Sequence, residues 1–378
     1  MGIDVTFLKE GQKGQALQTA TQLAEFIKAA KSSLHIAIYD FRLKDPKLSD
    51  LVLTALNDKA ASGVEVKVAY YAGRPAANTS SGDNALVEMD INQFIEVGGD
   101  PAPIGTDTFL ENMPKDSKVQ MKGITGSKLM HNKFIVRDVN TPEAALWTGS
   151  ANFTDDAWTY QENNIVQITS PELCAYYETD FQELWQSGDI RSTGVNDTGT
   201  VKIGQITVDV AFAPGEGQTI DQMISSIISS AKKRIKIASM VITSHGILGA
   251  LDDAIQNNQV ADFGGIYDGT QMGNVLKLWQ KSTNSDGIAA TFKEVATHLA
   301  SKHSTPYSPT GKHDFMHNKV VVCDDIVVTG SYNFSRSATQ NAENVLVLHD
   351  RALADKYSAY IDELIKHYKT TKATTKKA

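Results

Sequence analysis

The sequence lacks the features that disulfide-bonded, zinc-binding, membrane-spanning and secreted proteins require. Only two of its 378 residues are cysteines, Cys174 and Cys323, which lie far apart and in no metal-binding spacing. We therefore expect two buried thiols and neither a disulfide nor a zinc site. No apolar run approaches the roughly 18 to 20 residues of a membrane-spanning helix, and the segment MGIDVTFLKEGQKG lacks the basic and apolar parts of a secretion signal. These absences predict a soluble cytoplasmic protein without stable membrane insertion.

The sequence also lacks an excess of positive charge. It has 44 acidic and 36 basic residues, for a formal net charge of −8 at pH 7. This balance argues against bulk attraction to nucleic acid or to an anionic membrane, although a local basic groove remains compatible with it. The lysines of the tail KHYKTTKATTKKA favour a solvated, frayed terminus over a nucleic-acid-binding arm. A hydrophobic content of 41% indicates a folded protein, and the length suits two domains of about 150 to 200 residues each.

The same segments occur twice and in the same order. LMHNKFIVRD at 129–138 returns as FMHNKVVVCD at 315–324. Around this pair, AAKSSLHIAIYDF parallels SAKKRIKIASMVI, LWTGSANFTDDAWTYQENNIVQI parallels VVTGSYNFSRSATQNAENVLVL, and YETDFQELW parallels YSAYIDELI. This repetition predicts a duplicated chain with an N-terminal half at 1–190 and a C-terminal half at 191–378. The Gly- and Ser-rich stretch QSGDIRSTGVNDTGT is the expected seam between them.

Each half alternates between helical and extended patterns. The amphipathic run QTATQLAEFIKAAKSS precedes the short apolar stretch LHIAIYDF, and LSDLVLTALNDKAASG precedes VEVKVAYY. The stretch KFIVRD inside the first repeated motif has the composition of a strand in a covered sheet. Helices that alternate with strands predict an α/β fold in each half.

The repeated blocks carry polar residues whose spacing suits phosphate chemistry. Residues i and i+2 of a strand share a face, so each histidine is expected beside its lysine. An imidazole beside an ammonium suits an anion that is held and attacked, with amide and hydroxyl donors nearby. We expect each glutamate to bind a histidine ring nitrogen and fix its tautomer, and each aspartate to pair with a cation or cap a turn. The first set is His131, Lys133, Asp138, Ser150, Asn152 and Glu162, and the second is His317, Lys319, Asp324, Ser331, Asn333 and Glu343.

The doubled pattern H-x-K-x4-D followed by G-S-x-N resembles the phospholipase D superfamily over most of the chain. The resemblance implies two α/β halves packed side by side about a pseudo-twofold axis, with mixed sheets flanked by helices and both motifs in one cleft. It implies a phosphodiester reaction without metal or cofactor, in which one histidine forms a covalent phosphohistidine and the other transfers protons. By analogy His131 is the nucleophile and His317 the acid and base, with Lys133 and Lys319 in place of a metal. No dense cluster of metal ligands is evident elsewhere, and a monomer is plausible because both half-sites are in one chain.

The same residues suit more than one class of phosphodiester substrate. TGSYNFSRSATQNAENVLVL is similar to the bacterial endonuclease branch of that superfamily, so a nuclease with nucleic acid as its substrate is the first hypothesis. The alternative is a phospholipase D or phosphatidyl transferase acting on phospholipid head groups, and a third possibility is a catalytically silent phosphate-binding module. The side chains considered for a substrate cleft are Lys128 and Lys312 as phosphate ligands, together with Tyr39, Phe41, Arg42, Tyr71, Arg74, Trp158, Arg336, His303 and His313.

Overall fold

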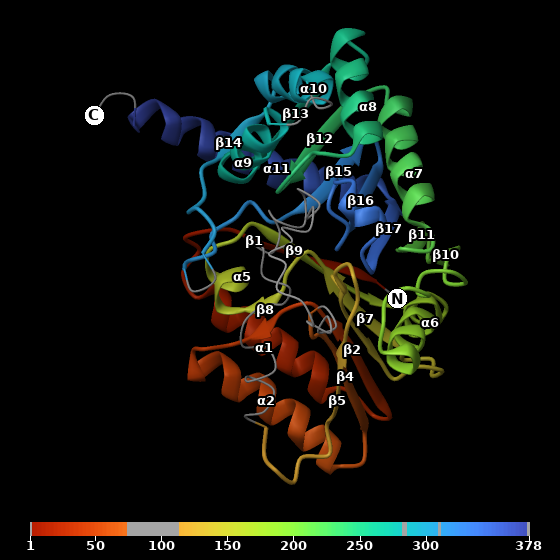
Figure 1. Ribbon diagram of the computed structural model, residues 1–378. Coiled ribbons are helices and arrows are strands. Elements are labelled where there is room, and N and C mark those ends of the chain that lie inside the picture. The colour runs from red at the N-terminus through yellow and green to blue at the C-terminus, as the bar shows by residue number, and fades with distance from the viewer. Residues whose placement is uncertain (1, 74–112, 282–285, 309–310, 376–378) are drawn as a thin grey trace, which may run out of the picture.

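The computed structural model describes residues 2–73, 113–281, 286–308 and 311–375 (Figure 1). Arg74, one of the residues considered for the cleft, lies outside this part of the chain. The elements of the first half are β1 (Ile3–Leu8), α1 (Gln15–Lys28), β2 (Ser33–Ile38), β3 (Phe41–Arg42), α2 (Pro46–Ala61), β4 (Glu65–Tyr71), β5 (Gln120–Ile124), β6 (Lys133–Arg137), β7 (Ala145–Gly149), β8 (Phe153–Thr154), α5 (Asp155–Thr159), β9 (Asn163–Thr169) and α6 (Pro171–Ser187).

The elements of the second half follow a similar order. They are β10 (Gly199–Ile203), β11 (Ile206–Ala213), α7 (Gly217–Ser230), β12 (Arg234–Ser239), α8 (His245–Gln256), β13 (Asp262–Asp268), α9 (Gly269–Trp279), α10 (Asp286–Thr297), β14 (Ala300–Lys302), β15 (Lys319–Cys323), β16 (Ile326–Gly330), the short 3-10 turn η1 (Ser337–Thr339), β17 (Glu343–His349) and α11 (Arg351–Thr375). Part of the basic tail is therefore helical, whereas the composition favoured a frayed end.

Two large mixed sheets repeat one topology. The first has the strand order β1-β9-β7-β6-β2-β4-β5, and the second has the order β10-β11-β17-β16-β15-β12-β13-β14. In the first sheet only β2, β4 and β5 pair in parallel, and in the second only β12, β13 and β14 do so. The strands β6 and β15, which begin at the lysines of the repeated motif, occupy matching central places. The prediction of two duplicated α/β halves with mixed sheets flanked by helices is confirmed.

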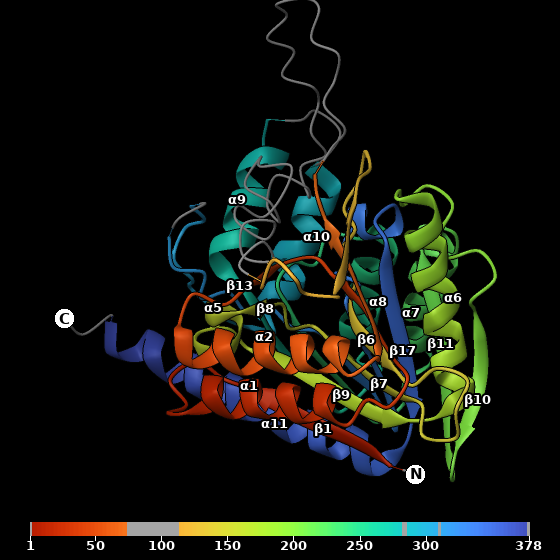
Figure 2. The same ribbon diagram turned by 90° about the horizontal axis from the view of Figure 1, so that it is seen from below.

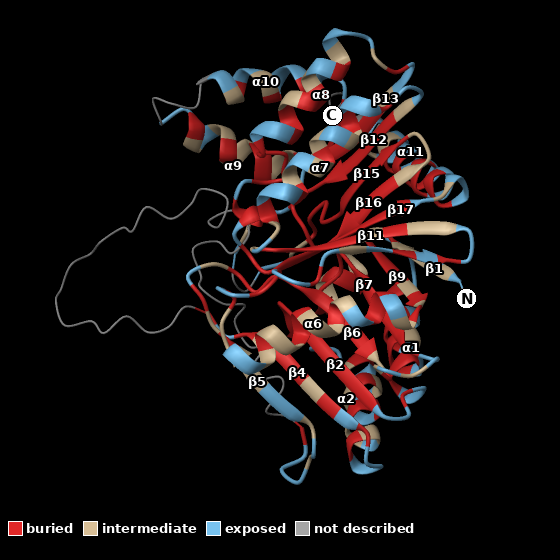
Figure 3. Ribbon diagram, turned by 90° about the vertical axis from the view of Figure 1, so that its right-hand side faces the viewer, coloured by how far each residue is buried: buried red, intermediate tan, exposed pale blue. Residues whose placement is uncertain are grey.

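Helices cover the outer faces of the two sheets and also fill the space between them. In the first half α1 and α2 lie side by side on the outer face (Figure 2), and in the second α7 and α8 do so. Between the sheets, α6 and α11 join a single hydrophobic core to which both halves contribute (Figure 3). Within it the rings of Phe134 and Phe212 lie 6.5 Å apart. The two halves therefore share a buried interface, and both motif strands contribute side chains to it.

The ends of the chain strengthen this interface. Tyr360 of α11 stacks on Phe7 of β1 with ring centroids 4.3 Å apart, and its hydroxyl donates to the carbonyl of Leu8 at 2.8 Å. A helix from the second half thus binds a strand from the first. Within the described residues, no helix is both long and apolar enough to cross a membrane.

Candidate active site

The two repeated motifs meet where the halves contact each other. His131 and His317 lie two residues before β6 and β15, so they precede the strands on which the sequence pattern placed them. The chain leaves each sheet there to pair with the opposite half. The backbone N–H of His131 donates to the carbonyl of Ala342 at 2.9 Å, and that of His317 donates to the carbonyl of Glu162 at 3.1 Å. Each histidine is therefore held by backbone from the other half.

The side chain of each histidine also finds its partner across the interface. His131 Nδ1 lies 2.8 Å from Glu343 Oε2, which also accepts a hydrogen bond from the Ser331 hydroxyl at 2.7 Å. A carboxylate accepts hydrogen bonds, so it holds the proton of this ring on Nδ1 and leaves the Nε2 lone pair available. Both side chains that orient His131 come from the second half of the chain.

The second histidine has a different partner. His317 Nδ1 lies 3.0 Å from Asn163 Oδ1, which accepts from the Ser150 hydroxyl at 2.8 Å. Ser150 and Ser331, considered as substrate ligands, thus bind the groups that orient the histidines. One imidazole is oriented by a carboxylate and the other by a neutral amide.

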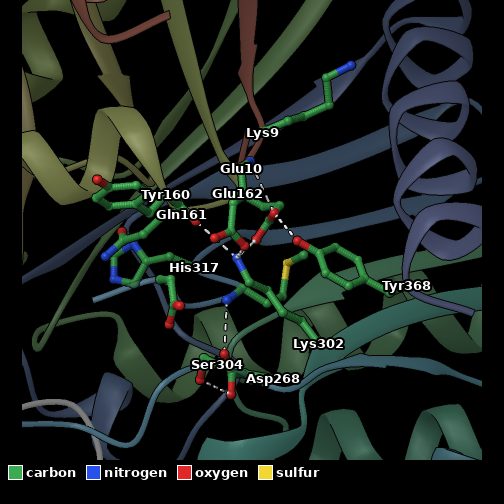
Figure 4. A network of polar contacts seen from close by, with 12 residues as sticks. Lys9, Glu10, Tyr160, Gln161, Glu162, Asp268, Lys302, Ser304, His317 and Tyr368 are labelled. Carbon is green, nitrogen blue, oxygen red and sulfur yellow. Dashed lines mark hydrogen bonds and ion pairs between the residues drawn. The ribbon is translucent and has the colours of Figure 1, made fainter. Parts of the chain in front are cut away.

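Glu162 does not bind a histidine ring, which corrects the expectation drawn from its spacing. The turn from Ser331 to β17 is one residue shorter than the turn from Ser150 to β9, so Asn163 is the structural counterpart of Glu343. Glu162 instead accepts a hydrogen bond from Lys302 at 2.8 Å and another from the hydroxyl of Tyr368 (Figure 4). Lys302 is buried, and nothing in its local sequence indicated this role.

Two buried ammonium groups set the charge of the site. Lys133 and Lys319 are each 1% exposed, and each Nζ donates to the carbonyl of its own motif histidine, at 2.6 and 2.7 Å. Burial and the positive charges of both lysines lower the pKa of His131 and of His317 well below the ordinary value of 6.5. Because lysines from both halves act on each imidazole, the four side chains form one electrostatic unit. At neutral pH both rings are uncharged before an anion binds.

The Gly-Ser turns approach the neighbouring strands so closely that a side chain does not fit. Gly149 has φ +136° and Gly330 has φ +137°, and a Cβ on either would lie 2.3 Å from the carbonyl oxygen of Asn164 or Asn344. These glycines place Ser150 and Ser331 against the residues that orient the histidines. Asn152 and Asn333 each lie three residues after the glycine of their turn, and both are buried.

A lattice of buried amides ties the two motifs together, and sequence reasoning did not assign it. Asn132 Oδ1 accepts from Asn344 Nδ2 at 2.8 Å, and Asn318 Oδ1 accepts from Asn164 Nδ2 at 3.0 Å. Each bond joins the residue between a motif histidine and lysine to a strand of the other half. The repeated H-N-K and the asparagines beside Glu162 and Glu343 were visible signals for it.

The motif aspartates lie at the far end of the strands and bind backbone. Asp138 accepts N–H bonds from Lys31 and Ser32 at 2.7 Å each, and Asp324 accepts the equivalent bonds from Lys232 and Lys233 at 2.9 and 2.7 Å. Both aspartates have positive φ angles, 55° and 52°. They fix the segment that enters the neighbouring strand, which is a structural role of the kind expected for them.

Replacing Asp138 with alanine should lower the free energy of unfolding by about 3 kcal/mol, because several backbone N–H groups lose a charged acceptor. Asp138→Asn should cost less, since asparagine tolerates the positive φ and keeps an acceptor oxygen. Burial acts to raise the pKa of Asp138, but the backbone N–H groups lower it below its ordinary value. This contribution is therefore present at neutral pH and is lost as the pH falls through the lowered pKa. Urea unfolding at pH 7 and pH 3 measures both effects, and equal stability of Asp138→Ala and wild type at pH 7 contradicts them.

The other residues considered for the cleft divide into neighbours of the site and packing residues. The Tyr39 ring contacts His131 with centroids 4.9 Å apart and lies 5.1 Å from Lys133 Nζ, and Tyr71 stacks on Tyr39. Phe41 and Trp158 are fully buried in the hydrophobic core that α1 and α2 form with the first sheet. His303 and Arg336 are exposed, and Lys128 is half-buried. His313 stacks between Tyr307 and Phe315.

Comparison with known proteins gives this geometry a family. Residues 23–185 and 224–365, which together make up most of the chain, match the family described as "Cardiolipin synthase, PLD-like domain", where PLD denotes phospholipase D. The chain belongs to this phospholipase D-like family. A phospholipase D of Rickettsia felis is 51% identical over 43 residues, and one of Rickettsia bellii is 54% identical over 43 residues. These alignments span only 22% and 21% of the Rickettsia proteins' own lengths.

Solved structures share the fold over almost the whole chain. Phosphatidylserine synthase of Haemophilus influenzae aligns over 97% of this chain and 86% of its own, with a TM-score of 0.62 and 14% identity. Polyphosphate kinase of Porphyromonas gingivalis aligns over 96% of this chain and 47% of its own, with a TM-score of 0.57 and 9% identity. The predicted superfamily is confirmed. The narrower placement in the endonuclease branch is not supported, because the family model is that of a cardiolipin synthase domain.

The lowered pKa of both histidines predicts that this phospholipase D-like protein takes up protons when an anion binds. A bound phosphate places negative charge between the imidazoles and raises their pKa toward its ordinary value. Titration with inorganic phosphate at pH 7 in buffers of different ionisation heat should therefore report a net uptake of protons on binding. His131→Gln and His317→Gln remove the titrating groups and serve as controls. Phosphate binding with no proton uptake in the wild type contradicts the lowered pKa of the free site.

Proposed function

We propose that the protein breaks a phosphodiester bond in a phospholipid head group through a covalent phosphohistidine, as a phosphatidyl transferase or phospholipase D. The observation that carries this proposal is the convergence of two histidine–lysine pairs, one from each half, on one site. Two imidazoles of this kind supply a nucleophile and a proton donor to the same phosphorus atom.

The reaction follows from the orientation of the two rings. The lone pair of His131 Nε2 attacks phosphorus, and the bond to the leaving oxygen breaks as His317 donates a proton to that oxygen. His317 then removes the proton of water or an alcohol, whose oxygen attacks phosphorus and releases His131. Lys133 and Lys319 stabilise the charge that develops on the non-bridging oxygens. The carboxylate of Glu343 favours His131 as the nucleophile because it stabilises the positive charge of a phosphorylated imidazole.

A lipid substrate is favoured over nucleic acid by the family and by the charges around the site. The name of the family model refers to phospholipid synthesis, and so does that of phosphatidylserine synthase, although that of polyphosphate kinase does not. Three cations that flank the motifs are already paired with carboxylates. Lys302 binds Glu162, Lys312 binds Glu10 at 2.9 Å, and Arg42 binds Asp40 at 2.6 Å. A polyanion tracked along a groove needs cations that are not neutralised in this way, and the net charge is −8.

The test compares substrates for one preparation of enzyme in EDTA. Mixed micelles of phosphatidylcholine and phosphatidylglycerol should yield phosphatidic acid. The same micelles with ethanol should also yield phosphatidylethanol. Bis-(p-nitrophenyl) phosphate reports whether the site is active at all, and His131→Asn is the blank. Cleavage of plasmid or single-stranded DNA with intact lipid contradicts the lipid assignment, and failure on every diester, including the nitrophenyl ester, contradicts the enzyme.

A further inference from the structure

Three carboxylates gather behind the first motif, at the junction of the halves. Asp180 and Glu183 lie one turn apart on α6, and Asp197 lies in the segment that leads to β10. One carboxylate oxygen from each of the three residues lies within 4.8 Å of the other two. Asp180 and Asp197 are fully buried, whereas Glu183 is partly exposed at the edge of the cluster.

Several oxygens of this cluster are buried without a partner. Among the residues that the structure describes, none other donates a hydrogen bond to Oδ1 of Asp180 or to either carboxylate oxygen of Asp197. Glu183 Oε2 accepts one bond from the Gly194 N–H at 2.9 Å. Within the described part of the chain, no cationic side chain forms an ion pair with any of the three. Buried carboxyl groups in such a setting are neutralised either by a bound cation or by protons.

The duplication shows that a carboxylate is not needed merely to hold the motif. Asp180 Oδ2 accepts from Asn132 Nδ2 at 3.0 Å, and in the second half the equivalent Asn318 Nδ2 donates to the Tyr360 hydroxyl at 2.9 Å. A neutral hydroxyl therefore serves the same purpose. Nor does Glu183 behave like its repeat counterpart Glu363, which forms a surface ion pair with Lys9. The pair of clustered carboxylates on α6 therefore has no equivalent on α11.

We propose that Asp180, Glu183 and Asp197 bind a divalent cation, and that Ca²⁺ fits them best. All three donors are carboxylate oxygens, which hard cations prefer. Carboxylate oxygens that all lie within 4.8 Å of one another can surround an ion with ligand distances of about 2.3–2.6 Å, as Ca²⁺ has. Ca²⁺ also accepts irregular coordination, whereas Mg²⁺ demands a near-ideal octahedron. The partly exposed side at Glu183 leaves room for water ligands.

The ion has a structural role and takes no part in the phosphodiester reaction. It neutralises the cluster and joins α6 to the segment between the halves. Through Asp180 it also fixes Asn132, the residue between His131 and Lys133. This inference is independent of the proposed substrate, because its measurement is binding and not turnover.

Protons are the competitor of the cation at this cluster. Burial and the neighbouring carboxylates raise the pKa of Asp180 well above its ordinary value and that of Asp197 to about 7. A cation bound at this cluster would take the place of these protons.

The test uses full-length protein stripped with EDTA and titrated with CaCl₂ at pH 7.5. Calorimetry should show one Ca²⁺ per chain, and saturating Ca²⁺ should raise the melting temperature by about 3 °C or more. Asp197→Asn and Asp180→Asn should weaken binding at least about tenfold and remove the thermal shift. Glu183→Gln changes only the partly exposed edge of the cluster and leaves the buried carboxylates of Asp180 and Asp197 in place. Glu172→Gln, which removes an exposed carboxylate from the first turn of the same helix, is the matched control.

The proposal is overturned if stripped wild-type protein binds no Ca²⁺ and its melting temperature ignores both Ca²⁺ and EDTA. In that case the carboxyl groups hold protons, and the melting temperature should instead vary with pH near 7. Equal Ca²⁺ binding by Asp197→Asn and wild type overturns the assignment of the ligands. Tighter binding of Mg²⁺ than of Ca²⁺ overturns the choice of ion.

Discussion

Replacing His317 with asparagine should produce an enzyme that becomes phosphorylated but fails to turn over. With bis-(p-nitrophenyl) phosphate the leaving nitrophenolate needs no proton, so attack by His131 proceeds without an acid. Release needs a base to activate water, and its loss should slow steady-state turnover by about 10²- to 10⁴-fold. We expect a burst of nitrophenol of one equivalent or less, and a mass increase on the peptide that contains His131. Rapid-mixing absorbance and intact-protein mass spectrometry measure these two quantities.

The reciprocal variant distinguishes the roles of the two rings. His131→Asn lacks the proposed nucleophile, so it should show neither a burst nor an adduct. If His131→Asn instead accumulates an adduct on the peptide that contains His317, the roles are exchanged. If neither variant forms an adduct and both keep activity, the covalent route is wrong. This pair of results does not depend on whether the natural substrate is a lipid.

Replacing Glu343 with glutamine should lower kcat by about 10²- to 10⁴-fold although Glu343 does not contact the reacting atoms. The glutamine amide can donate to His131 Nδ1, which places the ring proton on Nε2 and removes the lone pair that attacks phosphorus. Glu343 is a positioning residue, so the variant should form the adduct slowly even with the activated diester. The measurement is the rate of the burst as a function of pH.

Asn163→Asp is the matched control, because it gives His317 the carboxylate partner that His131 already has. The added charge stabilises the protonated ring, so the pKa of His317 and the corresponding limb of the pH–rate profile should move upward. A large loss in Asn163→Asp together with full activity in Glu343→Gln contradicts the assigned asymmetry.

Much of the fold could be predicted because the duplication makes each pattern visible twice. The motif strands, the helices before them and the seam after α6 follow from hydrophobic periodicity and from turn residues such as Gly188, which has φ +71° at the end of α6. The α/β class and the mixed sheets flanked by helices needed no information beyond local pattern and the family resemblance. The first half has more residues than the second between its motif aspartate and its Gly-Ser turn. They form a longer connection between β6 and β7 than the two residues that join β15 to β16.

The partners of the histidines could not be predicted because they depend on register in three dimensions. Glu162 and Glu343 stand at equal spacing from Asn152 and Asn333, which suggested equal roles. One residue of difference in the turns moves Asn163 into the place that Glu343 has in the other half. A slip of one position in a strand exchanges which side chain points into the interface, and spacing alone does not reveal it.

The acidic cluster was also beyond reach of the sequence. Asp180 and Glu183 are recognisable as neighbours on one helix face, but Asp197 comes from the irregular seam between the halves. Its approach to α6 depends on how that seam folds, and composition indicated only a linker. Local pattern therefore identified most of the polar residues that repeat, and the structure was needed for the buried amides and for the residues that lack a counterpart.

If an imidazole from each half acts on the same phosphorus atom, a complex with vanadate should show both rings at one metal-oxide centre. A crystal structure with metavanadate should show one vanadium per chain, bonded to Nε2 of His131, with His317 Nε2 within hydrogen-bond distance of the opposite oxygen and both lysines contacting the remaining oxygens. Two vanadates at separate sites, or one that touches only a single motif, contradicts the account.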